Sequence, residues 1–167
     1  MKRQNLELVP VRDIPLGNLV STDSLTDVYN VCIQLKELCK RENGVGISAV
    51  QAGVPWDLFL VRFPDGQFGY FLNCEYNPLN DVKIIHLEGC LSLKDAKGRL
   101  RNFVVERFKN LSVKGKKLVL EGSDLKIMDF EEEYEGFYAA VFQHEIDHSR
   151  QITIDQIGKE VDLTLLG

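Results

Sequence analysis

The sequence has no uninterrupted apolar segment of the roughly 20 residues that a membrane-spanning helix requires. Its opening, MKRQNLELVP, lacks the apolar core of about 7–15 residues that a secretory signal peptide carries, and it is not rich in Arg and Ser as transit peptides are. These absences predict a cytoplasmic protein that does not associate with a membrane.

Positive charge is also scarce, because 25 acidic residues outnumber 20 Lys and Arg residues and give a net charge of −5. Nucleic-acid-binding domains are usually basic. We therefore expect no direct binding of nucleic acid, although an acidic total still permits a local basic patch and a transient contact with the ribosome. Lys114, Lys116 and Lys117 form such a cluster, which we interpret as solvated residues of a turn.

The four cysteines do not suggest disulfide bonds. Cys32 and Cys39 lie seven residues apart in a helical pattern, so about 10 Å separates their backbones, more than a disulfide spans. We interpret them as core residues, and Cys74 likewise. The chain has no repeats or low-complexity segments, and 167 residues suit one domain with a core of its own, which we expect to span residues 1–167.

The hydrophobic pattern predicts strands in series with two helices, which is typical of an α+β fold. The first helix is expected over 24–42 and the second from about 131 to 148 or 150. The strands are expected at 56–63, 68–74, 82–87, 103–108 and in a hairpin over 111–120, closed by a Lys-Gly-Lys turn.

The stretch QHEIDH, residues 143–148, places two of the three histidines on one face of the last predicted helix. His144 and His148 can therefore reach one divalent ion, while Glu145 is rotated by about 100° and suits a general base beside it. Two histidines on a solvated helix end are the alternative, and the motif alone does not decide between them.

Two further stretches carry chemistry. In EGCLS, residues 88–92, Cys90 offers a thiolate ligand, although a lone cysteine after a strand is more often a core residue. In GVGISAVQ, residues 44–51, the glycines permit close approach of a ligand to the backbone and Gln51 offers an amide donor, although such glycines usually mark a turn.

Together the three stretches resemble, in order and spacing, the three motifs of the peptide deformylases, and the resemblance runs from about Val28 to Asp155. The first motif departs at Ile47 and Ser48, where the family usually has Leu-Ala. The resemblance implies an α+β fold in which antiparallel β-sheets pack around the HExxH helix of the C-terminal half, with one additional helix near the N-terminus.

The resemblance also implies a ligand set and a reaction. Cys90, His144 and His148 would hold one divalent metal ion, generally ferrous iron and replaceable by zinc, nickel or cobalt, with water in the fourth position. Glu145 would take a proton from that water, which attacks the formyl group of an N-formylmethionyl nascent peptide, and formate would be released. The Gln51 amide and the backbone N–H of Leu91 would stabilise the oxyanion.

Other residues are implied less directly. Val45 and Gly46 would lie along the substrate backbone. Glu88 would orient Gln51 or a metal ligand, or else be a surface acid at a strand end. Asp147 is expected either to support the site by a hydrogen bond or to be solvated.

The match has three departures. The family usually follows its histidines with Leu, any residue and Gly, whereas here the sequence is Ser149-Arg150-Gln151, so the helix is expected to lack the usual left-handed cap or to run on. His86 stands where an apolar residue usually borders the methionine pocket, and we expect it to be a strand residue rather than a ligand. Only 19 residues follow His148, which leaves little room for the long C-terminal helix of many bacterial members and predicts a different docking at the ribosome.

Two alternatives compete with a deformylase. A zinc peptidase that uses HExxH would need a third metal ligand after the second histidine, commonly glutamate or histidine. Glu160 is the only glutamate after His148, and no histidine follows. A non-catalytic module that keeps the metal for stability would need neither Glu145 nor Gln51.

Overall fold

The computed structural model describes residues 5–163, so residues 1–4 and 164–167 lie outside it. Its helical elements are η1 (Val11–Asp13), α1 (Leu25–Arg41), η2 (Ala49–Ala52), α2 (Phe137–Ser149) and α3 (Ile154–Ile157). Its strands are β1 (Gly46–Ser48), β2 (Leu58–Arg62), β3 (Phe68–Pro78), β4 (Lys83–Lys94), β5 (Leu100–Phe108), β6 (Asn110–Glu121), β7 (Asp124–Glu135) and β8 (Lys159–Val161).

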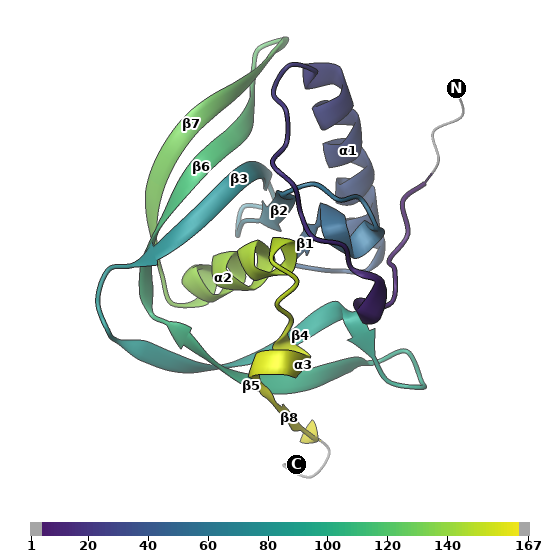
Figure 1. The fold of residues 1–167 in the computed structure, drawn as a ribbon, viewed down its shortest axis with the longest axis vertical. Helices are drawn as coiled ribbons and strands as arrows, with labels where there is room; N and C mark the ends of the chain where they lie inside the picture. Colours follow the sequence, from purple (N-terminus) through teal and green to yellow (C-terminus); the bar gives the residue numbers. More distant parts are fainter. Residues whose placement is uncertain (1–4, 164–167) are drawn as a thin grey trace.

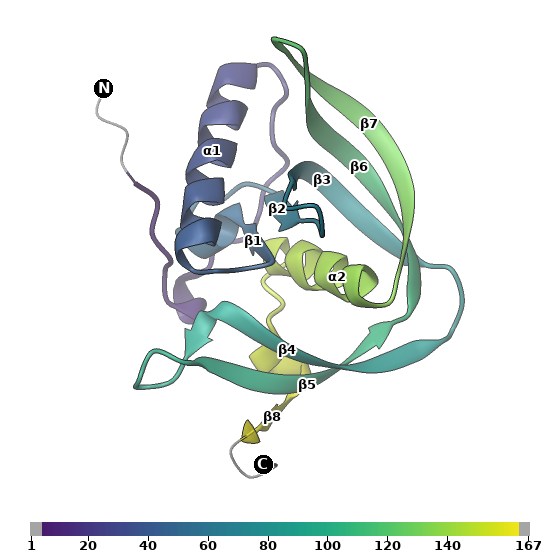
Figure 2. The same cartoon turned by 180° about the vertical axis from the view of Figure 1, so that it is seen from behind.

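The strands form two antiparallel sheets, one of five strands in the order β1-β2-β3-β6-β7 and one of three in the order β4-β5-β8. Helix α2 lies between the sheets, and α1 packs beside β1 and β2 (Figures 1 and 2). The predicted α+β fold of antiparallel sheets and few helices is thereby confirmed.

The apolar run Leu58–Val61 forms a strand that is buried on both faces. Leu58 and Leu60 pack in the core cluster under α1, whereas Phe59 and Val61 pack in a second cluster against α2. Because successive strand residues point to opposite faces, only a continuous apolar run can fill both clusters. Strand β2 therefore packs against α1 on one face and against α2, the helix that carries the histidines, on the other.

The predicted Lys-Gly-Lys turn was wrong, because β6 runs straight through these residues. A Cβ on Gly115 would lie 2.6 Å from Cys74 Sγ, so this glycine permits the close approach of two strands and does not mark a turn. The neighbouring lysines pair across the hairpin, with Lys116 Nζ 2.6 Å from Asp129 and Lys117 Nζ 3.0 Å from Glu132. They are strand residues with acidic partners.

The predicted start of the last helix was also wrong. Residues 124–135 form β7, which pairs with β6 along its whole length, and α2 begins only at Phe137. The acidic residues 131–133 instead extend the strand, where they pair with Lys114, Val113 and Ser112 of β6.

The end of α2 keeps the left-handed cap that the missing glycine was expected to remove. Gln151 adopts a φ of 59°, and its N–H and that of Ile152 bond to the carbonyls of His148 and Asp147, in the pattern of a Schellman motif. The Gln151 amide also donates to Ile14 O at 3.1 Å. The helix therefore ends at Ser149, directly after His148, without a glycine.

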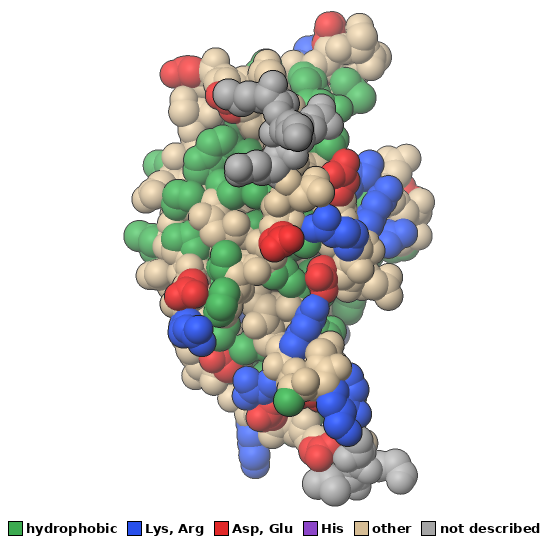
Figure 3. Space-filling model, turned by 90° about the vertical axis from the view of Figure 1, so that its right-hand side faces the viewer, with side chains coloured by type: hydrophobic (Ala, Val, Ile, Leu, Met, Phe, Trp, Pro, Cys, Tyr) green, Lys and Arg blue, Asp and Glu red, His purple; other side chains and the backbone are tan. Residues whose placement is uncertain are grey.

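Lys and Arg side chains are interspersed with Asp and Glu side chains on the face shown in Figure 3, so this face has no large patch of a single charge sign.

The four cysteines are buried and form no disulfide. Among residues 5–163, no helix is long and apolar enough to cross a bilayer.

Candidate metal centre

Three potential ligand side chains converge where β4 passes α2. The ligand atoms of Cys90, His144 and His148 all lie within 4.8 Å of one another. Cys90 Sγ is 3.6 Å from His148 Nε2, and the centroids of the two imidazole rings are 4.6 Å apart. A thiol from mid-chain therefore meets a pair of imidazoles four residues apart on a helix.

Strand β4 brings Cys90 inward through an irregularity in its pairing. The strand was expected to end at residue 87 but continues to Lys94, so the EGCLS stretch lies inside it. Pairing with β5 runs to Gly89–Asn102 and resumes at Lys94–Leu100, and both Cys90 and Leu91 are buried. Such bulges re-aim side chains beside functional sites.

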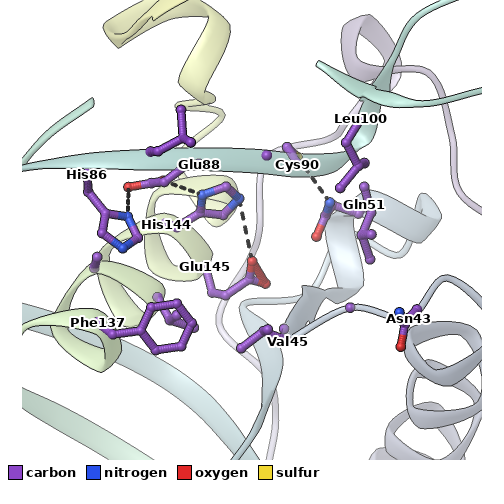
Figure 4. A pocket seen from close by; sticks show the side chains of 17 residues that line it. Asn43, Val45, Gln51, His86, Glu88, Cys90, Leu100, Phe137, His144 and Glu145 are labelled. Carbon is purple, nitrogen blue, oxygen red and sulfur yellow. Dashed lines mark hydrogen bonds and ion pairs between the residues drawn. The ribbon is translucent and has the colours of Figure 1, made fainter. Parts of the chain in front are cut away.

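Glu88 orients one of the histidines. His144 Nδ1 lies 2.7 Å from Glu88 Oε1, which leaves His144 Nε2 facing Glu145 Oε1 at 3.8 Å (Figure 4). Arg107 donates two hydrogen bonds to the same carboxylate, at 2.7 and 2.8 Å. Burial opposes ionisation of Glu88, but the Arg107 and His144 bonds outweigh it and hold its pKa well below the usual range. Glu88 is therefore neither a surface acid nor a partner of Gln51.

Asp147 belongs to the same buried network. It accepts hydrogen bonds from Arg107 at 3.1 Å and from the Tyr76 hydroxyl at 2.9 Å. Arg107 thus joins two carboxylates, one on β4 and one on α2. Asp147 was expected either to support the site by a hydrogen bond or to be solvated, and the structure shows it hydrogen-bonded and buried.

Glu145 is a buried carboxylate with an uncommitted oxygen. Its Oε1 lies 3.8 Å from His144 Nε2 and 3.6 Å from His148 Nδ1, and its Oε2 has no hydrogen-bond partner among the described residues. Burial raises its pKa to about 7. A Cβ on Gly46 would lie 3.2 Å from Glu145 Cγ, so the glycine makes room for this side chain.

Gln51 presents its amide to the thiol. Its Nε2 lies 3.4 Å from Cys90 Sγ and donates to Ser92 Oγ at 3.0 Å, while its Oε1 accepts from the Ser48 N–H at 3.0 Å. Leu91 follows the thiol on β4 and packs against α1 and its neighbours. Both residues line the cleft over the candidate ligands.

The cleft itself is mainly apolar. Its apolar walls come from the three-stranded sheet, α2 and the loop before β1, and they comprise Val45, Leu87, Leu91, Leu100, Phe137, Ala140 and Val141. His86 lines the same cleft, with Nδ1 3.2 Å from Glu88 Oε2 and its ring 5.8 Å from that of Phe137 (Figure 4). It lies in β4 as expected and is not in the cluster of candidate ligands.

The donor set fits a divalent cation. One sulfur and two imidazole nitrogens suit borderline metals such as iron and zinc. Burial opposes protonation of His144, but the Cys90 side chain and the Glu88 and Glu145 carboxylates raise its pKa to about 10, so the surroundings favour positive charge at this place. Glu160, the alternative ligand, instead pairs with Arg101 at 2.6 Å and lies outside the cluster.

Sequence reasoning missed Arg107, Tyr76 and the partners of Gln51. The signal for Arg107 is present, because it continues the alternation of the buried residues Phe103 and Val105 along β5 and must therefore point inward. A buried arginine requires acidic partners, which the adjoining motifs supply.

Comparison with known sequences gives matches over most of the chain. Residues 18–161 match the family described as polypeptide deformylase. The peptide deformylase of Desulforudis audaxviator is 34% identical over 121 residues, covering 72% of this chain and 71% of that protein. Peptide deformylase 2 of Bacillus subtilis is 32% identical over 134 residues, covering 76% of this chain and 67% of that protein.

Solved structures share the fold. A class I type b peptide deformylase from Acinetobacter baumannii is 26% identical with a TM-score of 0.75, and the alignment covers 90% of this chain and 97% of that one. A structure of the A. baumannii enzyme described as bound to Met-Ala-Ser has a TM-score of 0.73 at 25% identity and covers 91% and 97% of the two chains. With motifs, fold and relatives in agreement, the chain belongs to the polypeptide deformylase family.

Proposed function

We propose that this chain is a metal-dependent peptide deformylase that removes the N-formyl group from N-formylmethionyl nascent polypeptides and releases formate. The observation that carries the proposal is the convergence of the Cys90 thiol with the His144 and His148 imidazoles beside the buried Glu145 carboxylate. Membership of the family supports the same activity.

Cys90, His144 and His148 would hold the ion, which we assign as ferrous iron, with zinc, nickel or cobalt able to replace it. Three protein ligands leave a coordination position open, as catalytic sites do. When bound, such an ion polarises a carbonyl oxygen and lowers the pKa of a water molecule.

Glu145 is assigned as general base and general acid. It takes a proton from the attacking water as the oxygen bonds to the formyl carbon, and it then gives this proton to the amine nitrogen as the C–N bond breaks. Its raised pKa, caused by burial, suits a group that must both accept and donate a proton near neutral pH. Its unpartnered Oε2 is free for this purpose.

Gln51 and Leu91 are assigned to the oxyanion that develops on the formyl oxygen. The Gln51 Nε2 lies beside Cys90 Sγ, so its N–H donors stand next to the place of reaction. We assign the backbone N–H of Leu91 as the second donor. Removing one donor of this kind typically costs about 3 kcal/mol of barrier stabilisation.

The cleft supports a peptide that begins with an apolar side chain. Its wall over α2 is apolar, and we assign Val45 and Gly46 to the substrate backbone, with Glu88 acting through His144. The A. baumannii relative is described as bound to Met-Ala-Ser, a peptide of the product class. We propose that residues 1–167 form one catalytic domain, which acts in the cytoplasm and contacts the ribosome only transiently.

The decisive test is formate release from formyl-Met-Ala-Ser by anaerobically prepared iron enzyme. We expect turnover by the wild type and a loss of about 10²–10⁴-fold in Glu145→Ala at equal metal content. A wild type that binds metal but releases no formate would favour the non-catalytic module.

Metal content separates the deformylase from the peptidase alternative. We expect Cys90→Ala to lose the ion and Glu160→Ala to keep it, because Glu160 pairs with Arg101 away from the cluster. The reverse pattern would overturn the proposed ligand set. Gln51→Ala should lower turnover while it leaves the metal content intact.

A further inference from the structure

We propose that Ser48 is a positioning residue that couples the metal ligand His148 to the amide of Gln51, an inference that rests on the proposed function. Ser48 ends β1, and its side chain is 0% exposed. Its Oγ lies 3.1 Å from His148 Nδ1 and 3.2 Å from Gln51 Oε1. Because the family motif usually has alanine at this place, the hydroxyl is a feature of this chain.

The direction of each hydrogen bond follows from what the partners are able to donate. The Ser48 backbone N–H faces a Gln51 side-chain atom at 3.0 Å, and a backbone N–H only donates, so this atom is the amide oxygen. The Ser48 hydroxyl faces the same oxygen and therefore donates its proton to it. Its lone pairs are left for His148 Nδ1.

This arrangement fixes the tautomer of His148. An oxygen whose proton is already committed acts as an acceptor, so His148 Nδ1 carries the hydrogen and Nε2 carries the lone pair. His148 Nε2 is the ring nitrogen that lies 3.6 Å from Cys90 Sγ, on the side of the candidate ion. Ser48 thus holds the ring in the form that a ligand needs.

The same hydroxyl also orients Gln51. Two donors from one residue, the Ser48 N–H and Oγ–H, hold Gln51 Oε1 and turn Nε2 toward Cys90 and Ser92. One buried side chain thereby sets the geometry of a ligand and of an oxyanion donor. Without the hydroxyl, His148 Nδ1 still lies 3.6 Å from Glu145 Oε1, an oxygen of the proposed base.

The test compares Ser48→Ala, Ser48→Thr and Ser149→Ala with the wild type. Ser48→Ala only removes an oxygen and introduces the family's usual residue, so we expect it to fold. Ser48→Thr keeps the hydroxyl. Ser149→Ala is the matched control, because it removes a buried hydroxyl that faces Gly17 and not the site.

Two measurements report on positioning apart from activity. The ¹⁵N resonances of His148 in the metal-free protein give the tautomer, and competition between the protein and a chelator for Co²⁺ gives the metal affinity. In Ser48→Ala we expect a mixture of tautomers, an affinity lower by about tenfold and a several-fold lower kcat at unchanged KM. Ser48→Thr should restore all three, and Ser149→Ala should match the wild type.

The outcomes separate this proposal from the proposed function. If Ser48→Ala keeps the wild-type tautomer and Co²⁺ affinity, the positioning role is overturned even where the wild type releases formate. A Ser48→Thr protein that melts at the wild-type temperature but does not recover the tautomer would also overturn it. If the tautomer and affinity change as expected but no variant releases formate, Ser48 positions His148 and the deformylase assignment fails.

Discussion

Replacing Glu88 by Gln measures what the buried carboxylate contributes, because the amide keeps the size of the side chain and removes its charge. Glu88 receives two hydrogen bonds from Arg107 and lies within hydrogen-bond distance of the Nδ1 atoms of His144 and His86. The Arg107 side chain is only 3% exposed, so water cannot replace a lost partner. In the variant, Arg107 would keep Asp147 as its one carboxylate.

Breaking a buried ion pair from one side typically costs about 3–5 kcal/mol. Because Asp147 remains, we expect the lower end of this range, about 3 kcal/mol. For a domain of this size each kcal/mol lowers Tm by about 2–4 °C, so the Tm of the metal-free protein should fall by roughly 6–12 °C. Denaturant unfolding followed by circular dichroism gives the free energy directly.

Glu160→Gln is the matched control, because it removes the same charge from a pair of similar geometry at the surface. Arg101 contacts Glu160 with two nitrogens, at 2.6 and 3.2 Å, but the two side chains are 38% and 48% exposed. Such pairs contribute less than about 1 kcal/mol. Equal losses of stability in the two variants would refute the reasoning from burial.

The Glu88 variant also tests the orientation of His144. Loss of a partner that orients a ligand typically lowers metal affinity by about 10–100-fold. We therefore expect Glu88→Gln, but not Glu160→Gln, to lose Co²⁺ in competition with a chelator. An unfolding defect with unchanged affinity would mean that Glu88 stabilises the fold and does not orient the ligand.

Substitutions at three further positions have expected outcomes. Gln151→Gly should raise the free energy of unfolding by up to about 1 kcal/mol, because the strain of the left-handed backbone that glycine relieves exceeds the lost hydrogen bond to Ile14. Gln151→Ala should lower the free energy of unfolding, because it keeps the strain and loses the hydrogen bond. Equal stabilities of the two variants in a denaturant titration would contradict this. Gly46→Ala should lower formate release at unchanged metal content, because the new Cβ would press on Glu145, and a variant with wild-type kcat would show that the base tolerates displacement. His86→Ile should lower kcat/KM for a formyl-glutaminyl peptide by roughly fivefold relative to a formyl-methionyl peptide. The substitution removes from the cleft wall a hydrogen-bond partner for the glutamine side chain, which is worth about 1 kcal/mol. An unchanged ratio would place the imidazole ring away from the bound side chain.

The parts of the site that could be predicted from the sequence are those fixed by local geometry. The four-residue spacing of His144 and His148 places both on one helix face wherever the helix lies, and the structure does bring them together. The approach of Cys90 is not local. Only the resemblance indicated it, because the irregularity that turns its side chain inward arises from pairing between β4 and β5.

The strand errors have the same origin. Lys-Gly-Lys is a reasonable turn by local propensity, and the acidic residues near 131 are reasonable helix formers. What decides their structure is that β6 and β7 pair along their whole length with opposite charges across the ladder. Gly115 illustrates the limit, because its close contact with Cys74 involves a strand about forty residues earlier.

Helix α2 shows how the polar residues of the site are reconciled with burial. Gln143 and Asp147 lie among apolar neighbours, yet Gln143 bonds to both backbone groups of Phe108, and Asp147 bonds to Arg107 and Tyr76. Each of these hydrogen bonds joins the helix to a strand. The free-energy cost of burying the polar groups is therefore offset by hydrogen bonds that also fix the position of the helix. Two groups of α2 are exceptions, because Ser149 Oγ and Glu145 Oε2 are buried with no hydrogen-bond partner among the described residues. Of these two residues, only Glu145 lines the cleft. Helix α2 therefore satisfies its other buried carboxylate, Asp147, and its buried amide, Gln143, with partners from the strands. It leaves Glu145 Oε2 without a partner from the folded chain, and the proposed base needs such an oxygen to accept a proton from an incoming water molecule.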